Sequence, residues 1–238
     1  MAKASKPRYR LLAADEIVET LDALKARIEA RFPGAGLAGV AGEVRDLIAE
    51  TAATTRAIMR PRWLLRLVVA GVLAGAAALL AALVLRLDFD AGTNNIFNLV
   101  QSIDALVNLT ILSAVAVVSL VTAERRLRRS RALQALNPFR AVVHVIDMHQ
   151  LTKDPGMVGP GAVRTAVSPE RSMTPFELSR YLDYCSELLS LTAKGAALYA
   201  IATEDGEIAT AVNEIEQLTT NLSQKIWQKI MIVNATGR

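Results

Sequence analysis

The chain has one cysteine, only two histidines and few aromatic residues. A single cysteine, Cys185, cannot form an intrachain disulfide, which excludes the disulfide-rich class of small secreted domains. Aromatic residues make up 5% of the sequence although hydrophobic residues make up 52%, so the apolar content is mostly Ala, Leu, Val and Ile. Because that content is concentrated between Trp63 and Ala123, the composition indicates a membrane region between two more polar regions.

Motifs for catalysis or for phosphate binding are also missing. We find no phosphate loop, no nucleophile elbow and no convincing catalytic dyad or pair of carboxylates. Residues 34–39 match the spacing G-x-G-x-x-G, but a dinucleotide site needs a strand before these glycines. Here a helical pattern ends at Phe32, so we interpret the glycines as a turn of a helical hairpin. We therefore predict a protein that is not an enzyme and that has no cofactor or metal ion.

The positive charge is placed beside the apolar region. The net charge is only +4, but arginines gather in two clusters. The clusters consist of Arg56, Arg60, Arg62 and Arg66, and of Arg125, Arg126, Arg128, Arg129 and Arg131. Nucleic-acid recognition modules are missing, and both clusters adjoin apolar runs, so we interpret them as membrane-flanking charge and expect no nucleic-acid partner.

Two apolar runs have the length of transmembrane helices. Residues 67–85 and residues 105–123 contain no charged side chain. Each run approaches the roughly 20 helical residues that cross about 30 Å of hydrocarbon. The alternative is two buried helices of a soluble protein, which the arginine-rich flanks disfavour.

The arginine clusters also predict the orientation. The positive-inside rule places both clusters in the cytoplasm and residues 87–103 outside. The basic N-terminus is followed by acidic residues and not by an apolar core, so we expect no cleavable signal peptide. The sequence thus predicts a multi-pass protein of the cell (inner) membrane with both termini cytoplasmic.

Small residues form a stripe on the first predicted span. Gly71, Gly75, Ala78 and Ala82 fall on one helix face. Small side chains allow a second helix to approach closely, so this face is a candidate for packing against the second span or against another copy of the chain. The alternative is that Ala and Gly are simply common in spans.

The second predicted span begins with a polar face. Gln101, Asp104 and Asn108 share one side of a helix that starts near Asn95. In a symmetric oligomer this face would line a pore, with Asp104 as a cation-attracting ring. The alternative, which we favour, is that Asp104 lies at the headgroup level as an interfacial residue.

Amphipathic patterns predict helices in both cytoplasmic parts. The N-terminal part, residues 1–60, reads as a helical hairpin of residues 14–32 and 37–59. In the C-terminal part we expect the membrane helix to end at Asn137–Pro138, where a new helix begins. A flexible loop is predicted near residues 153–173.

A capping box and a turn motif define the last two predicted helices. Thr174 and Glu177 have the spacing of a capping box, which begins a helix that runs to about Ala202. Asp205 and Gly206 form the following turn, and a final helix carries apolar residues at spacings of three and four. These two helices should pack as an antiparallel αα-hairpin.

Both histidines of the chain lie close together in the sequence. His144 and Asp147 share a helix face, but His149 is about 140° away from His144 on a 3.6-residue helix. Two histidines at that angle are poorly placed to bind one metal ion. We favour a structural cluster of His144, Asp147 and His149, and keep a pH-sensing role as the alternative.

We therefore predict an all-α fold with a two-span transmembrane hairpin, residues 61–136, and cytoplasmic helical hairpins at both termini, residues 1–60 and 137–238. The predicted function is that of a membrane-anchored scaffold or regulator, with the lipid bilayer, further copies of the chain and a protein bound to the cytoplasmic helices as partners. The alternative function is a homo-oligomeric cation channel or pore lined by the second span.

Overall fold

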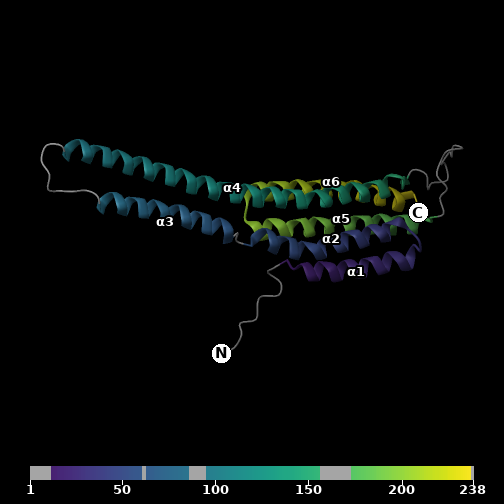
Figure 1. Cartoon of the computed structure of the whole chain (residues 1–238). Coiled ribbons are helices and arrows are strands. Elements are labelled where there is room, and N and C mark those ends of the chain that lie inside the picture. Colours follow the sequence, from purple (N-terminus) through teal and green to yellow (C-terminus); the bar gives the residue numbers. More distant parts are fainter. Residues whose placement is uncertain (1–11, 61–62, 86–94, 156–172, 237–238) are drawn as a thin grey trace, which may run out of the picture. The chain divides into compact units, whose positions relative to one another are not determined.

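The computed structural model describes residues 12–60, 63–85, 95–155 and 173–236, and this part of the chain is all-helical, with no strand. Its six helices are α1 Ala14–Arg31, α2 Gly36–Met59, α3 Trp63–Leu85, α4 Asn95–Leu151, α5 Pro175–Thr203 and α6 Gly206–Thr236 (Figure 1). The all-α prediction is confirmed. The loops predicted on either side of α4 fall mostly on residues 86–94 and 156–172, which lie outside the described residues.

The chain divides into two compact units. We call Arg60–Ser130 the two-helix unit, because it contains α3 and the first part of α4. The described residues up to Met59 and from Arg131 onward form the bundle unit. The N-terminal and C-terminal helices therefore share one unit and one hydrophobic core.

The first two helices of the bundle unit form the predicted hairpin. α1 buries Ile17, Leu21, Leu24 and Ile28, the four residues whose spacing predicted its apolar face. The turn contains Gly34 at φ +76°, in the left-handed region that glycine enters without steric cost. The glycines of residues 34–39 thus follow a helix, as the hairpin interpretation requires.

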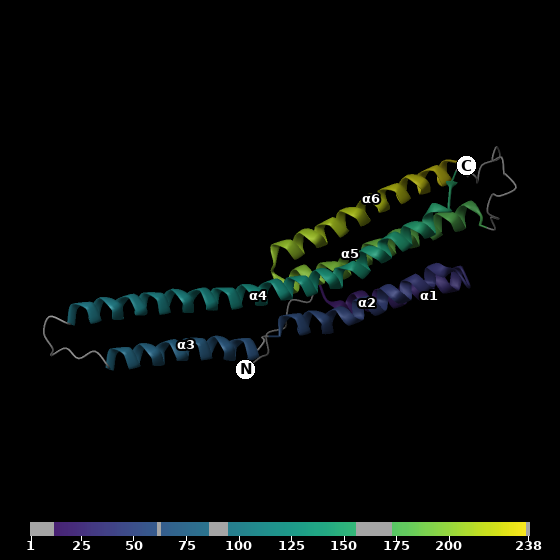
Figure 2. The same cartoon turned by 45° about the horizontal axis from the view of Figure 1, so that its top comes forward.

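α5 lies at the centre of the bundle unit, beside α1, α2 and α6 (Figures 1 and 2). It has buried residues on several of its sides, whereas α1 buries a single stripe. At Gly195 a β-carbon would lie 2.5 Å from Ile48 of α2 and 2.8 Å from the Phe139 ring of α4. Three helices therefore meet at a position where only a hydrogen atom fits.

Two local motifs begin and end α5 as predicted. The Thr174 hydroxyl accepts a hydrogen bond from the Glu177 amide at 3.2 Å, and the Glu177 carboxylate accepts one from the Thr174 amide at 2.8 Å. α5 ends with Glu204 in the left-handed conformation, at φ 50°. Asp205 then accepts a hydrogen bond from the Glu207 amide at 3.0 Å and caps α6.

The predicted helix break at Asn137–Pro138 is wrong. α4 continues through Pro138 to Leu151. Proline in a helix interior removes a backbone hydrogen bond and costs about 3 kcal/mol. Burial on both sides of Pro138 opposes that cost, since one apolar face continues across it with a constant spacing of three or four residues. The members of this face are Ala132, Leu136, Phe139, Val143 and Ile146.

Candidate functional site

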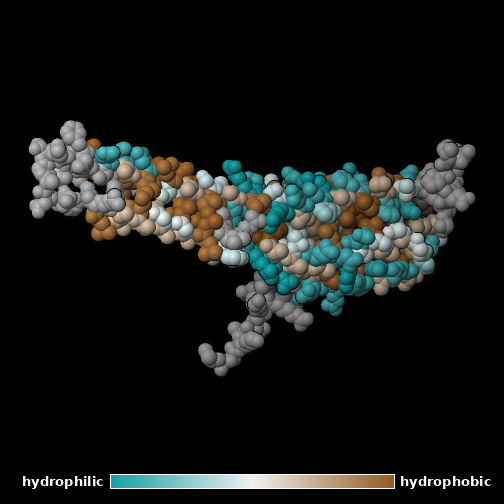
Figure 3. Space-filling view, in the orientation of Figure 1, coloured by the Kyte–Doolittle hydropathy of each residue, from teal (hydrophilic) through white to brown (hydrophobic). Residues whose placement is uncertain are grey.

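The two-helix unit has an apolar surface. None of the side chains described in α3 or in the first part of α4, up to Ser130, is buried. Leu112 and Val118, for example, are 67% and 64% exposed. Figure 3 shows apolar residues covering much of the visible surface of this unit. Soluble monomers rarely expose contiguous apolar patches beyond a few hundred Å².

One helix in the described part of the chain, over Ile103–Leu151, contains a stretch that is long and apolar enough to cross a membrane. A second apolar stretch, Leu67–Leu79, is shorter. No part of the most apolar window of the longer helix is buried within the protein. The long exposed stretch is compatible with a membrane protein.

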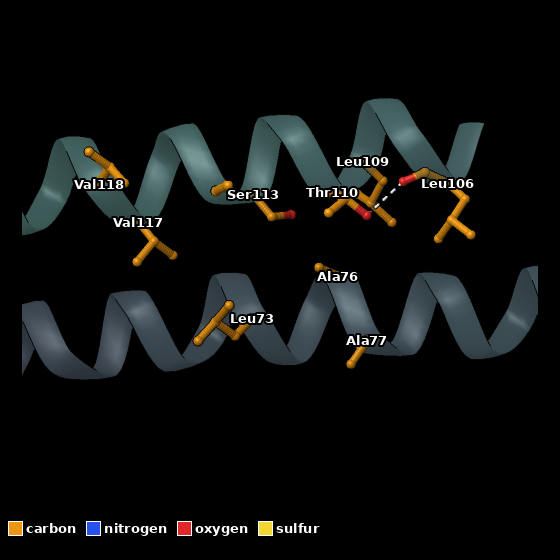
Figure 4. A pocket seen from close by; sticks show the side chains of 10 residues that line it. Leu73, Ala76, Ala77, Leu106, Leu109, Thr110, Ser113, Val117 and Val118 are labelled. Carbon is orange, nitrogen blue, oxygen red and sulfur yellow. Dashed lines mark hydrogen bonds between the residues drawn. The ribbon is translucent and has the colours of Figure 1, made fainter. Parts of the chain in front are cut away.

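A groove runs between α3 and α4 within the two-helix unit (Figure 4). Its volume is about 460 Å³. It is lined by Leu73, Ala76 and Ala77 of α3 and by Leu106, Leu109, Thr110, Ser113, Ala114, Val117 and Val118 of α4. The Thr110 hydroxyl donates to the Leu106 carbonyl at 2.8 Å, so this polar group is satisfied within its own helix.

The small-residue stripe of α3 is not part of this groove. Gly71, Gly75, Ala78 and Ala82 are all exposed. A β-carbon at Gly71 or Gly75 would have no other atom within 4 Å. The stripe is therefore open to a partner helix, and α4 does not occupy it.

The predicted polar face of α4 is also exposed. Gln101, Asp104 and Asn108 all face outward, and the groove lining does not include them. The Asn108 amide donates to the Asp104 carboxylate at 3.2 Å, which confirms that these two residues share a face. One turn of α4 thus presents a carboxylate and an amide on its outside, at the start of the uncharged run of residues 105–123.

The two histidines have different surroundings in the bundle unit. His144 is exposed, whereas His149 is half-buried, with Nδ1 3.4 Å from the Tyr181 hydroxyl oxygen. A β-carbon at Gly36 would lie 2.9 Å from the His149 ring. Asp147 accepts a hydrogen bond from the side chain of Gln150. His149 and Asp147 thus contact different residues, Tyr181 and Gln150.

Metal ligands do not converge in the described part of the chain. No group of three His, Cys, Asp or Glu side chains there is placed to bind a metal ion. Asp183 and Glu187, which lie near Cys185 in the sequence, pair with arginines. Burial raises the pKa of the Cys185 thiol to about 12, so it stays protonated at neutral pH and is a poor nucleophile or metal ligand.

A contact between Lys229 of α6 and the end of α4 was not predicted from the sequence. The Lys229 ammonium donates to the backbone carbonyl of Gln150 at 2.9 Å and to its side-chain oxygen at 2.5 Å. Burial lowers the pKa of Lys229, and the negative charges of Asp154 and Asp147 oppose that effect. A cation at a helix C-terminus satisfies free carbonyl groups and interacts favourably with the helix dipole. We therefore interpret this contact as a cap that stabilises the C-terminal end of α4.

No family model, curated protein or solved structure matched this chain in the comparisons.

Proposed function

We propose that this protein is a non-enzymatic, membrane-anchored scaffold or regulator. α3 and the first part of α4 form a two-span hairpin in the bilayer, and the helices of the bundle unit bind a partner protein or another copy of the chain. One observation carries this proposal: the two-helix unit exposes its apolar side chains, whereas the bundle unit buries a continuous apolar core. A surface of the first kind is stable in lipid and a surface of the second kind is stable in water.

The arginine clusters support an orientation with both termini in the cytoplasm of a cell whose inner membrane holds the protein. Arg56 and Arg60 precede α3, and Arg125 and Arg126 follow the apolar part of α4. Cytoplasmic segments beside spans carry an excess of Lys and Arg. The proposal therefore places residues 86–94 on the outer side of the membrane.

Alkaline extraction and cysteine labelling test this proposal. The full chain should stay in the membrane pellet at alkaline pH, where peripheral proteins are released. In a Cys185→Ser background, cysteines introduced at Ser5 and Thr236 should resist an impermeant thiol reagent in intact cells, and one at Thr93 should react. Release of the chain from the pellet overturns the anchor, and external labelling at either terminus overturns the orientation.

A homo-oligomeric cation channel is a second candidate function. It is favoured by the outward-facing Gln101, Asp104 and Asn108 on α4. Polar groups within a bilayer face water or protein, because contact with lipid costs several kcal/mol. Several copies that bring these faces together would enclose a polar path with one carboxylate per copy.

Replacement of Asp104 by Asn tests the channel, because it removes the charge and keeps the shape. Cation flux into proteoliposomes should fall or lose selectivity, while expression and oligomer size stay unchanged. Asn108→Ala removes a polar group from the same face and leaves the charge, so comparison of the two variants separates the effect of charge from that of polarity. A wild-type protein that is monomeric in detergent, or that conducts no ions, excludes the channel and leaves the scaffold.

A further inference from the structure

Three arginines from two helices line a depression of about 500 Å³ in the bundle unit. Arg27 and Arg31 lie on successive turns of α1, and Arg180 lies on α5. Residues four apart on a helix point the same way, so the two α1 arginines face α5 together. Ala30 and Tyr184 complete the lining. We call this depression the arginine groove.

An aromatic ring holds two of the guanidinium groups in place. The Arg27 and Arg180 guanidinium carbons lie 5.8 Å and 5.2 Å from the centre of the Tyr184 ring, within cation–π distance. Tyr184 itself is only 2% exposed, so the ring is a fixed part of the core. The Arg31 guanidinium lies 5.5 Å from the ring of Phe176, which is 63% exposed. The groove thus has ordered positive groups and a partly exposed aromatic ring at its edge.

The carboxylates around the groove use only part of the hydrogen-bonding capacity of these arginines. Glu187 accepts from Arg27 at 2.7 Å and 3.4 Å, and Asp183 accepts from Arg180 at 2.7 Å. Arg31 forms no ion pair with any described residue. Because each guanidinium has five N–H donors, donors remain for a ligand that carries acceptor oxygens.

Glu177 is the remaining acidic neighbour, and it is already engaged. Hydrogen bonds from the Thr174 backbone and side chain lower the pKa of this carboxyl group, and the Arg31 charge lowers it further. Both hydrogen bonds go to Oε2 of Glu177, which is therefore held at the start of α5, and Glu177 forms no ion pair with Arg31.

We propose that the arginine groove binds an acidic segment of a partner protein, through carboxylates spaced along an extended or helical peptide. Arg27 and Arg180 lie beside the Tyr184 ring and Arg31 lies beside the Phe176 ring, so a ligand that carries several separated carboxylates can meet all three guanidinium groups. Arginine forks match carboxylates well, and arginine and aromatic residues are enriched at protein interfaces. The inference rests on the proposed scaffold function, since it names the chemistry of the scaffold's partner.

Binding of a fluorescein-labelled peptide of alternating Glu and Ala to the purified full chain in detergent tests the proposal. Arg31→Gln should weaken binding roughly two- to fivefold, the range of one exposed ion pair, and more at low salt. Arg31 forms no ion pair within the described part of the chain, so the thermal midpoint should fall only slightly, through loss of the contact with the Phe176 ring. Arg45→Gln is the matched control, because Arg45 lies on α2 outside the groove and pairs with Asp22 and Asp46.

A second pair of variants should strengthen binding. Glu187→Gln removes the carboxylate that competes for Arg27, so the peptide should bind roughly two- to fivefold more tightly. Glu214→Gln changes the net charge equally but releases only Arg140, which is not in the groove, and should have a smaller effect.

Equal effects of the groove variants and their controls would overturn the proposal, because they would show that net charge alone sets the affinity. Binding to anionic lipid vesicles or to inositol hexakisphosphate, with no peptide binding, would overturn the assignment to a protein partner. Failure of the peptide test in a chain that still resists alkaline extraction rejects the groove and leaves the membrane anchor standing.

Discussion

α3 and α5 are built from similar residues but have opposite surroundings. Both helices are rich in Ala and Leu and contain glycine in their interior. α5 buries residues on several sides, from Leu178 to Tyr199, whereas none of the side chains described in α3 is buried. The difference is visible in the charges. α5 carries Arg180, Asp183 and Glu187 on the sides that reach the surface, whereas residues 67–85 contain no charged residue.

Apolar content alone thus does not distinguish a core helix from a helix with an exposed apolar surface. A core helix needs neighbours on most sides, and α5 has α1, α2 and α6. Two helices that pack along one groove leave most of their surface uncovered, as α3 and the first part of α4 do. A surface of this kind is compatible with contact with lipid or with further helices.

Truncation of one large apolar side chain in each unit should give the largest difference. Phe139 is fully buried and meets the Tyr199 ring edge to face at 6.0 Å, so Phe139→Ala should destabilise the bundle unit by about 3–5 kcal/mol. Leu112 is 67% exposed, and Leu112→Ala should leave the thermal midpoint nearly unchanged. Thermal unfolding of the full chain in detergent, followed by circular dichroism, measures both variants. A similar loss for the two would show that the contrast in packing is wrong.

A methyl group added at one glycine of each unit should give a smaller difference. Gly195→Ala forces Ile48 and Phe139 to move, because the new β-carbon would lie within 3 Å of both, and should cost about 1–3 kcal/mol. Gly75→Ala adds a methyl group in open space and should be neutral or slightly stabilising, since alanine favours the helix. The shift of the thermal midpoint measures both. A tolerated Gly195→Ala would mean that α2 and α4 do not meet α5 this closely.

The smallest effect on folding, but a distinct effect on assembly, is expected from a bulky residue on the small-residue stripe. Gly75→Leu puts a large side chain on the stripe and blocks close approach of a second helix, whereas Leu79→Phe exchanges one large side chain for another at a position outside the four small residues. Crosslinking in membranes should lose the oligomer band with Gly75→Leu and keep it with Leu79→Phe. Equal bands would mean that Gly71, Gly75, Ala78 and Ala82 reflect composition and not packing.

Local signals in the sequence predicted the helices and their ends well. The spacing of Ile17, Leu21 and Leu24 defined the buried face of α1, and the capping box at Thr174 defined the start of α5. The prediction failed at Pro138, where a local helix breaker is overcome by burial on both sides. Tertiary packing outweighs local propensity at such positions.

Contacts between distant parts of the chain could not be predicted in this way. In the sequence, Gly195 is one more glycine within a predicted helix. Only the structure shows that Ile48 and Phe139 lie against it. Lys229 of α6 donates a hydrogen bond to Gln150 of α4, and no pattern in the sequence indicates that these two residues are close. The angle of about 140° between His144 and His149 depends only on helix geometry, and the two side chains do lie in different surroundings. The functional roles proposed for residues in the two-helix unit, including that of Asp104, remain predictions.

The reactivity of Cys185 reports on the opening of the bundle unit. Its thiol is fully buried and stays protonated at neutral pH, so a thiol reagent reaches it only when the helices around it separate. The rate of modification of the unaltered chain therefore measures how often the bundle opens, without any introduced probe. A ligand that binds the closed bundle would slow this reaction in proportion to its occupancy, so the same thiol can screen for partners whose identity is unknown.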